Sequence, residues 1–167
     1  LAYTLDIHAA HPGGTNGYHP HSHEFTNEQT SGGAFGMLII GDNQNDINAW
    51  ARIENEKLLQ ISNTGTLLGN GSTNEDILLE TGKWYRLRVS VVTPSARASD
   101  VGFVGDGCIV YKVASDGVWH TAPLDSYPGT AFELTGASRA DFAINCPFSG
   151  TGSITWGKGV AATLQIG

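Results

Sequence analysis

The chain has 167 residues, of which 40% are hydrophobic and 15% charged, a composition typical of a globular protein with a sizeable core. Its formal net charge is −7 and its Lys and Arg residues form no cluster, so we expect neither a nucleic-acid partner nor an anionic membrane surface. The longest apolar runs, such as residues 37–40, are far too short to cross a bilayer, and no membrane insertion is expected.

Alternating or short continuous apolar stretches predict a series of short β-strands. In chain order, the expected strands are residues 1–7, 18–23, 35–40, 84–92, 108–114, 131–134, 140–146, 152–156 and 160–166. The continuous apolar run at 35–40 predicts a strand buried on both faces. One short helix is expected at residues 24–31, with Thr26 as a possible N-cap and Gln29 at the capping-box position. Many short strands separated by glycine-containing turns predict an all-β sandwich or Greek-key barrel.

The polar segment 42–48, rich in Asn and Asp, is interpreted as a surface loop or linker and as the candidate domain boundary. The chain begins at Leu1, within a predicted strand, and has neither an initiator Met nor a signal peptide. We therefore expect either a processed chain or a piece of a longer one.

The two cysteines, Cys108 and Cys146, are not part of a CxxC pair. In a glycine-rich β protein they fit one disulfide of a secreted protein, or two buried thiols. The sequon Asn70-Gly71-Ser72 is compatible with a secretory protein, although such triplets also occur by chance.

Five of the six histidines lie within the first 23 residues, and the last three of these occupy alternate positions. On an extended chain, residues two apart point to the same side, with Cβ atoms about 6–7 Å apart. Two imidazoles placed in this way can hold two neighbouring metal ions, and imidazole suits copper and zinc. The alternative is a surface feature without a metal. The five residues are His8, His11, His19, His21 and His23.

The sequence around these histidines resembles the end of the first cupredoxin domain of multicopper oxidases. The stretch 11–23 reads HPGGTNGYHPHSH, where the family pattern is HPGGTFWYHPHxH. The continuation is also similar, since Gln29, residues 32–40 and Asp42 fit the family pattern QxxxGxxGMLIVxD.

Later segments resemble the second cupredoxin domain of the same family. Residues 70–71 (NG) and 82–89 (GKWYRLRV) are similar to the segments that open and form its early strands. Residues 114–117 (ASDG) and 137–141 (ASRAD) resemble a turn and the start of a late strand. The resemblance implies a cupredoxin-like fold, with residues 1–42 as the C-terminal part of a first domain and 43–167 as a second domain.

The resemblance implies that His21 and His23 are metal ligands, one for each copper of the dinuclear type 3 pair. In the family this pair and a type 2 copper form the centre at which dioxygen is reduced to water. His19, His8 and His11 do not match ligand positions in that pattern. No catalytic residue and no other cofactor-binding residue is assigned.

The chain departs from the family pattern in several places. The family uses four HxH pairs, and this chain has one such segment. Cys108 and Cys146 have no histidine neighbours, so neither matches the HCH motif of a type 1 copper site. Gly17 stands where the family has an aromatic residue, and Glu24 stands where it has glycine. Glu24 is close enough in sequence to influence the histidines, or it faces solvent.

Two further groups of residues have alternative interpretations. The aromatic residues are expected in the core or on sheet faces rather than as a substrate platform. Arg139 and Asp141 are expected in a structural ion pair or a turn, not in a reaction. The aromatic residues concerned are Trp84, Tyr85, Trp119, Phe142 and Trp156.

The first hypothesis is therefore a laccase-like or ferroxidase-like oxidoreductase segment that binds part of a type 3 copper pair and acts on a phenolic or metal-ion substrate. The missing ligands would come from the remaining cupredoxin domains of a parent chain or from another subunit, and this chain alone is expected to be inactive. The second hypothesis is a non-catalytic cupredoxin-like structural or binding module. A third is a small copper carrier. A secreted or extracytoplasmic location is expected for the oxidase.

Overall fold

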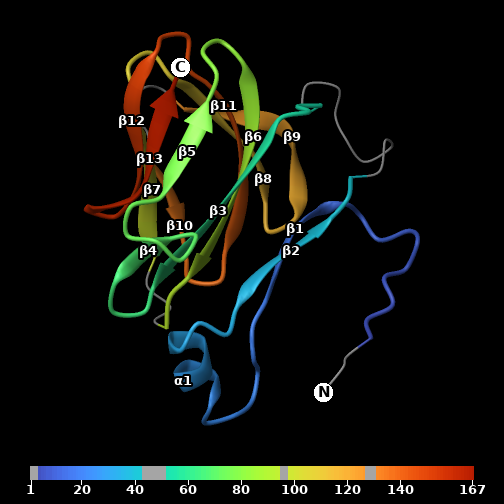
Figure 1. Cartoon of the computed structure of the whole chain (residues 1–167). Coiled ribbons are helices and arrows are strands. Elements are labelled where there is room, and N and C mark those ends of the chain that lie inside the picture. Colours follow the sequence, from blue (N-terminus) through green and yellow to red (C-terminus); the bar gives the residue numbers. More distant parts are fainter. Residues whose placement is uncertain (1–3, 43–51, 95–97, 127–130) are drawn as a thin grey trace.

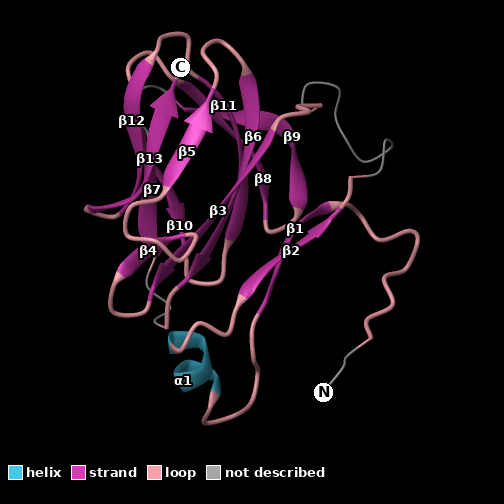
Figure 2. Cartoon of the chain, in the orientation of Figure 1, coloured by secondary structure: helices cyan, strands magenta, loops and turns pink. Residues whose placement is uncertain are grey.

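The computed structural model describes residues 4–42, 52–94, 98–126 and 131–167. Within these ranges the chain is almost entirely β-structure, and the only helix is α1 (Thr26–Ser31), shown in cyan in Figure 2. The strands are β1 (Gly14–Tyr18), β2 (Gly36–Ile40), β3 (Glu56–Asn63), β4 (Leu67–Gly69), β5 (Asp76–Leu79), β6 (Trp84–Val92), β7 (Ser99–Val104), β8 (Ile109–Ser115), β9 (Val118–Ser126), β10 (Ala131–Leu134), β11 (Arg139–Asn145), β12 (Gly150–Trp156) and β13 (Gly159–Ile166).

Two sheets form a β-sandwich, as predicted. The 6-stranded sheet has the order β4-β3-β6-β11-β8-β9, and the 5-stranded sheet has the order β10-β7-β12-β13-β5. Most neighbouring strands are antiparallel, but β3 runs parallel to β6 and β13 runs parallel to β5. Figure 1 shows the sandwich on one side and the β1–β2 hairpin on the other, beside β8 and β9.

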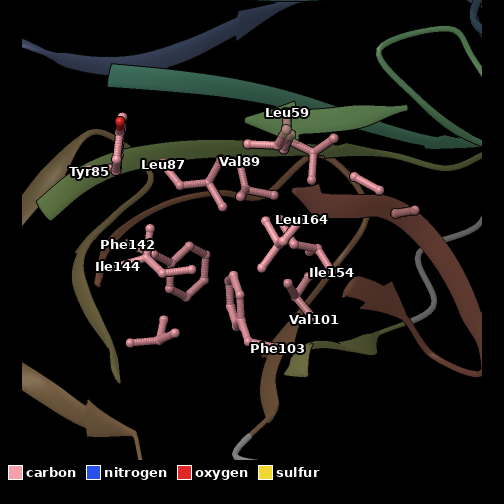
Figure 3. Packing of buried hydrophobic residues seen from close by; sticks show 14 of the residues in the cluster. Leu59, Tyr85, Leu87, Val89, Val101, Phe103, Phe142, Ile144, Ile154 and Leu164 are labelled. Atoms are coloured by element: carbon pink, nitrogen blue, oxygen red, sulfur yellow. The ribbon is translucent and has the colours of Figure 1, made fainter. Parts of the chain in front are cut away.

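The core lies between the two sheets and follows from the alternation in β6. Leu87, Val89 and Val91 are at most 1% exposed and belong to the core. Figure 3 shows Leu87 and Val89 pointing inward, on the side of Ile154 and Leu164 of the opposite sheet. The ring of Phe142 on β11 meets that of Phe103 on β7 at a centroid distance of 4.9 Å in an edge-to-face arrangement.

The hairpin of β1 and β2 is antiparallel and pairs Tyr18 with Gly36. A Cβ atom added at Gly36 would lie 2.6 Å from Cζ of Tyr18, so the tyrosine ring covers the glycine. The prediction that residues 35–40 are buried on both faces is wrong, because every residue of β2 is only half-buried. An apolar strand that is half-covered retains apolar surface that further protein can bury.

Several other predictions need correction. Residues 4–7 do not form a strand. Of the predicted strand at 18–23 only Tyr18 lies in a strand, as the last residue of β1, because the chain then turns into α1. Thr26 is not the N-cap of α1; Phe25 occupies that position, and the Thr26 hydroxyl instead donates to the Ser22 carbonyl at 2.7 Å. The proposed boundary segment, residues 42–48, lies outside the described residues except for Asp42.

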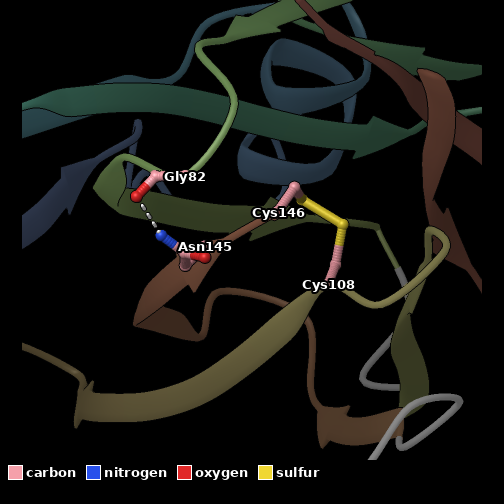
Figure 4. The surroundings of a disulfide bond; sticks show 4 residues. All are labelled: Gly82, Cys108, Asn145 and Cys146. Atoms are coloured by element: carbon pink, nitrogen blue, oxygen red, sulfur yellow. Dashed lines mark hydrogen bonds between the residues drawn. A yellow bond between two sulfur atoms is a disulfide. The ribbon is translucent and has the colours of Figure 1, made fainter. Parts of the chain in front are cut away.

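Cys108 and Cys146 form a disulfide with an S–S distance of 2.09 Å (Figure 4). Both half-cystines are buried, and the bond joins the start of β8 to the end of β11. Beside it, the Asn145 side-chain amide donates to the Gly82 carbonyl at 2.7 Å. The disulfide alternative for these cysteines is therefore confirmed, and the two sulfur atoms are not available as metal ligands.

Candidate metal centre and its structural support

The candidate ligands lie on an exposed segment between β1 and α1. The ring centroids of His21 and His23 are 6.2 Å apart, and the ring planes are nearly perpendicular at 83°. The ring of His19 lies 6.3 Å from that of His21 on the other side. All three side chains are exposed, so their imidazoles are accessible to a metal ion.

A compact turn connects this segment to α1. The Ser22 carbonyl accepts hydrogen bonds from the backbone N–H groups of Phe25 at 3.2 Å and Thr26 at 2.9 Å. Glu24, within this turn, has a positive φ of 73°. A residue with a Cβ adopts that conformation only at a cost, whereas glycine adopts it freely. The Glu24 side chain is exposed.

Other histidines are held by their own backbone neighbours. The ring Nδ1 of His8 accepts from the Ala10 N–H at 3.1 Å, and Nδ1 of His11 lies 2.7 Å from the Pro12 carbonyl. In the same way Nδ1 of His19 lies 2.8 Å from the Pro20 carbonyl. His21 and His23 make no such contact within the described part of the chain, so both of their ring nitrogens remain available.

Two imidazoles do not complete a coordination shell for copper or zinc. Over residues 4–42, 52–94, 98–126 and 131–167, no group of three or more His, Cys, Asp or Glu side chains is placed to hold a metal ion. Exposed imidazoles with free nitrogens are nonetheless suitable donors for copper. The residues therefore fit one part of a metal centre that takes its other ligands from elsewhere.

A buried ion network joins the β1–β2 hairpin to the 6-stranded sheet. Arg86 and Arg88, alternate residues of β6, point to the outer face of this sheet but are only 2% exposed. Arg86 Nη2 lies 2.5 Å from Asp141 Oδ2 and also pairs with Asp42. Arg88 Nη2 lies 2.5 Å from Glu56 Oε1 and 3.3 Å from Asp42 Oδ2. The network therefore neutralises two buried guanidinium groups with three carboxylates.

Thr15 of β1 completes the network. Its hydroxyl donates to Asp141 Oδ1 at 2.6 Å and accepts from Arg88 Nη1 at 3.0 Å, and the residue is fully buried. Because both a donor and an acceptor role are satisfied, the hydroxyl is buried without an unpaired group.

The glycines before Thr15 permit this close contact. A Cβ atom at Gly14 would lie 2.7 Å from the Gly117 carbonyl oxygen, and one at Gly13 would lie 2.3 Å from Asp42 Cα. Gly117 belongs to the β8–β9 turn, in which both Asp116 and Gly117 have positive φ, as a tight two-residue hairpin turn requires. The HPGGT and ASDG motifs therefore meet in space.

Trp119 of β9 also contacts the network, through Arg86. Its ring lies over the Arg86 guanidinium at 4.2 Å, a cation–π contact. Neither Trp119 nor Glu56 is recognisable as a network member from the sequence alone. The available signal is the pair of arginines at alternate positions of a strong strand, which predicts buried carboxylate partners without identifying them.

The structure also places the aromatic residues and the charged residues Arg139 and Asp141 that the sequence singled out. Tyr85, Phe142 and Trp156 belong to the core, whereas Trp84 is 40% exposed on a sheet face. Arg139 pairs with Asp116 at 3.3 Å, and Asp141 pairs with the β6 arginines, so both have structural roles as expected.

The overall architecture was compared with known proteins. No protein-family model matches the sequence, and no curated protein matches it. Among solved structures, a multicopper oxidase of Pseudomonas thermotolerans superposes with a TM-score of 0.75 at 21% identity, covering 93% of this chain and 41% of that one. A multicopper oxidase of Campylobacter jejuni, described as a metallo-oxidase, gives 0.73 at 21% identity, covering 92% and 38%.

A copper nitrite reductase of Nitrosomonas europaea is also similar, with a TM-score of 0.74 at 14% identity, covering 93% of this chain and 63% of that one. The chain therefore spans less than two thirds of these structures. Over almost all of its length it has the cupredoxin-like all-β fold of the multicopper oxidases. Within the described residues, no helix is long and apolar enough to span a membrane.

Proposed function

We propose that this chain is a segment of a multicopper oxidase and that His21 and His23 each bind one copper of a type 3 pair. The observation that carries the proposal is the position of these two side chains. Their rings are exposed and neighbouring, 6.2 Å apart, on a segment that connects two elements of a multicopper-oxidase fold.

Copper bound at such a pair would supply coordination sites for dioxygen, and the four electrons that reduce it to water would come from the oxidised substrate by way of the further coppers of the complete enzyme. The contribution of this chain is to provide the imidazoles and to hold their segment in place. The buried Thr15 anchors β1 to the sandwich through Asp141 and Arg88, which fixes the point at which the histidine segment begins. The turn at Ser22 fixes the point at which it ends.

The remaining ligands would come from other cupredoxin domains of a parent chain or from another subunit. The half-buried apolar strand β2 supports this part of the proposal, because residues 37–40 retain apolar surface in a two-stranded hairpin. Two strands alone are rarely stable in water, and further strands or a covering domain would bury that surface. The substrate would be a phenolic compound or a metal ion.

We also propose a secreted or extracytoplasmic location. The buried Cys108–Cys146 disulfide supports it, because disulfides persist in oxidising compartments and are rare in the cytosol. The sequon adds no support: the Asn70 amide already donates to the Leu58 carbonyl at 3.0 Å and to Glu75 Oε1 at 2.7 Å, and a glycan on that nitrogen would replace one of the two donating hydrogens.

A second candidate function is a non-catalytic cupredoxin-like structural or binding module. One observation favours it: Thr15, Arg86 and Asp141, which lie within the motifs, all belong to the buried network and so have structural roles. In this alternative the histidines would be surface residues.

The test is copper content per chain, by elemental analysis, together with the intact mass of the material purified from its natural source. Copper in a larger chain or a tight complex supports the oxidase segment. A free chain of 167 residues without copper contradicts it and leaves the binding module.

A matched pair of variants would locate the metal. Replacing His21 and His23 with Ala should remove the bound copper, whereas replacing His8 and His11 with Ala should leave it. Equal loss in both double variants would show that the metal binds to the histidine-rich start in general, and would contradict the assignment.

A further inference from the structure

A groove lies on the outer face of the 6-stranded sheet, beside the first residue of β6. It has a volume of 480 Å³ and is lined by residues of β6, β8, β9 and β11 and by the segment 52–55. Its base is apolar and includes Val113 and Ala143. It shares no residue with the histidine segment, so it is independent of the proposed copper site.

Two aromatic rings form one wall of this groove. The rings of Trp84 and Tyr111 are nearly parallel, at 25°, with centroids 6.0 Å apart. Trp84 begins β6 and Tyr111 lies on β8, the strands on either side of β11. On β11, Ala143 pairs with Tyr111. Because the alanine side chain is small, it leaves the space above the sheet to the two rings. Trp84 is 40% exposed, so its ring face remains available to a ligand.

The rim of the groove is polar. Lys83 is already paired with Glu80 at 2.5 Å, so the guanidinium of Arg52, beside the carboxylate of Glu54, is the cation that the rim offers to a ligand. The Asn55 amide donates to the Trp84 carbonyl at 3.2 Å and so holds the rim segment against the start of β6. A guanidinium at the edge of an apolar groove favours a planar carboxylate, which it can bind with two parallel hydrogen bonds.

We propose that this groove is a binding site for a small planar aromatic carboxylate. The ring would stack against Trp84, and the carboxylate would lie at the rim, near Arg52. The volume is within the range of ligand pockets, roughly 300–1,000 Å³, and an apolar pocket with a few convergent polar groups is typical of such sites. Aromatic stacking supplies a preference for planar rings, and the guanidinium supplies a preference for carboxylate.

The experiment is ligand-observed saturation-transfer NMR on the intact chain, with benzoate as the probe. Benzamide, which keeps the ring without the charge, and cyclohexanecarboxylate, which keeps the charge without the planar ring, are matched ligand controls. We expect benzoate to bind most strongly. Equal binding of cyclohexanecarboxylate, or no transfer to benzoate, would overturn the proposal.

Protein variants test the two halves of the site separately. Trp84→Ala should weaken benzoate binding by about 2- to 10-fold, whereas Trp84→Phe should retain most of it. Phe148→Ala removes a 62% exposed ring outside the groove and should have no effect. Arg52→Gln should weaken benzoate but not benzamide. Unchanged benzoate binding in a folded Trp84→Ala variant would exclude this groove as the site.

Discussion

The hydroxyl of Thr15 donates a 2.6 Å hydrogen bond to the carboxylate of Asp141, although 126 positions separate the two residues. Thr15 lies on β1 and Asp141 on β11, so this bond joins the hairpin to the sandwich. Both residues are at most 1% exposed. The contact explains why a threonine follows the paired glycines in a segment otherwise noted for its histidines.

Replacing Thr15 with Val should destabilise the chain while preserving its shape. The variant removes a hydroxyl that serves both Asp141 and Arg88, and leaves those buried groups with one partner fewer. We expect a loss of about 1–3 kcal/mol in the free energy of unfolding, measured by urea denaturation. Thr121→Val on β9 is the control, because Thr121 is exposed, and it should change stability by less than about 0.5 kcal/mol.

Asp141→Asn tests the ion network itself. Asp141 contacts both Arg86 and Arg88, as Asp42 and Glu56 do, but its side chain is the least exposed of the three, at 2%. Removing its charge leaves two buried guanidinium groups with only Asp42 and Glu56, and Glu56 is 38% exposed. Two carboxylates then still balance the two guanidinium groups, so we expect a loss of about 1–3 kcal/mol, from the weakened hydrogen bonds of Asp141.

The control for this variant is the more exposed pair Asp116–Arg139. Asp116→Asn retains a residue that tolerates the positive φ of 49° and retains an acceptor for the Arg139 N–H. Its effect should be below about 1 kcal/mol, because exposed ion pairs contribute little. Equal losses in the two variants would contradict the central position of Asp141 in the network.

The strands that were predicted from the sequence share a clear pattern. Each has either regular alternation or a short continuous apolar run. Residues 84–92 show the alternation, and the structure confirms β6 with those bounds. The all-β sandwich followed from several such segments. The contacts between motifs did not, because pairing between Arg88 and Glu56 depends on the parallel arrangement of β3 and β6, which no local pattern encodes.

The strands that were missed have identifiable reasons. β9 contains Pro123, which argues against a central strand, but β9 lies at the edge of its sheet, where a proline is tolerated. β7 contains Gly102, and a Cβ there would lie 2.6 Å from Oγ1 of Thr155 on β12, so the glycine permits close strand approach. β3, β4 and β5 were also missed; β4 has 3 residues and β5 has 4, too few for a reliable alternation.

The candidate site was predictable only in part. The alternation of His21 and His23 and the resemblance to a family identified the two side chains, and the structure places their rings side by side. That pattern contained no information about further ligands. It also did not predict that the strand ends at Tyr18, because the turn into α1 depends on the bonds to the Ser22 carbonyl.

The disulfide should contribute substantially to stability. Cys108 and Cys146 are 38 positions apart, and closing a loop of that length reduces the entropy of the unfolded chain by an amount equivalent to about 4 kcal/mol. The double variant Cys108→Ala, Cys146→Ala should therefore lose about 2–4 kcal/mol in the free energy of unfolding, measured by denaturant titration. An unchanged midpoint in the double variant would show that the bond does not form in solution.

Glu24→Gly should raise stability, which is unusual for a substitution by glycine. Glu24 has φ of 73°, and a left-handed conformation costs a residue with a Cβ roughly 1–2 kcal/mol relative to glycine. The greater freedom of glycine in the unfolded chain offsets part of this gain, so a net increase of about 0.5–1 kcal/mol is expected in thermal or urea unfolding.

Glu28→Gly in α1 is the contrasting control for this variant. Glu28 is an exposed helical residue four positions further on, and glycine there should lower stability by about 1 kcal/mol. If both variants lowered stability, the left-handed conformation of Glu24 would not be the one that the folded chain adopts. Opposite signs in the two variants would support the turn that places His21 and His23 ahead of α1.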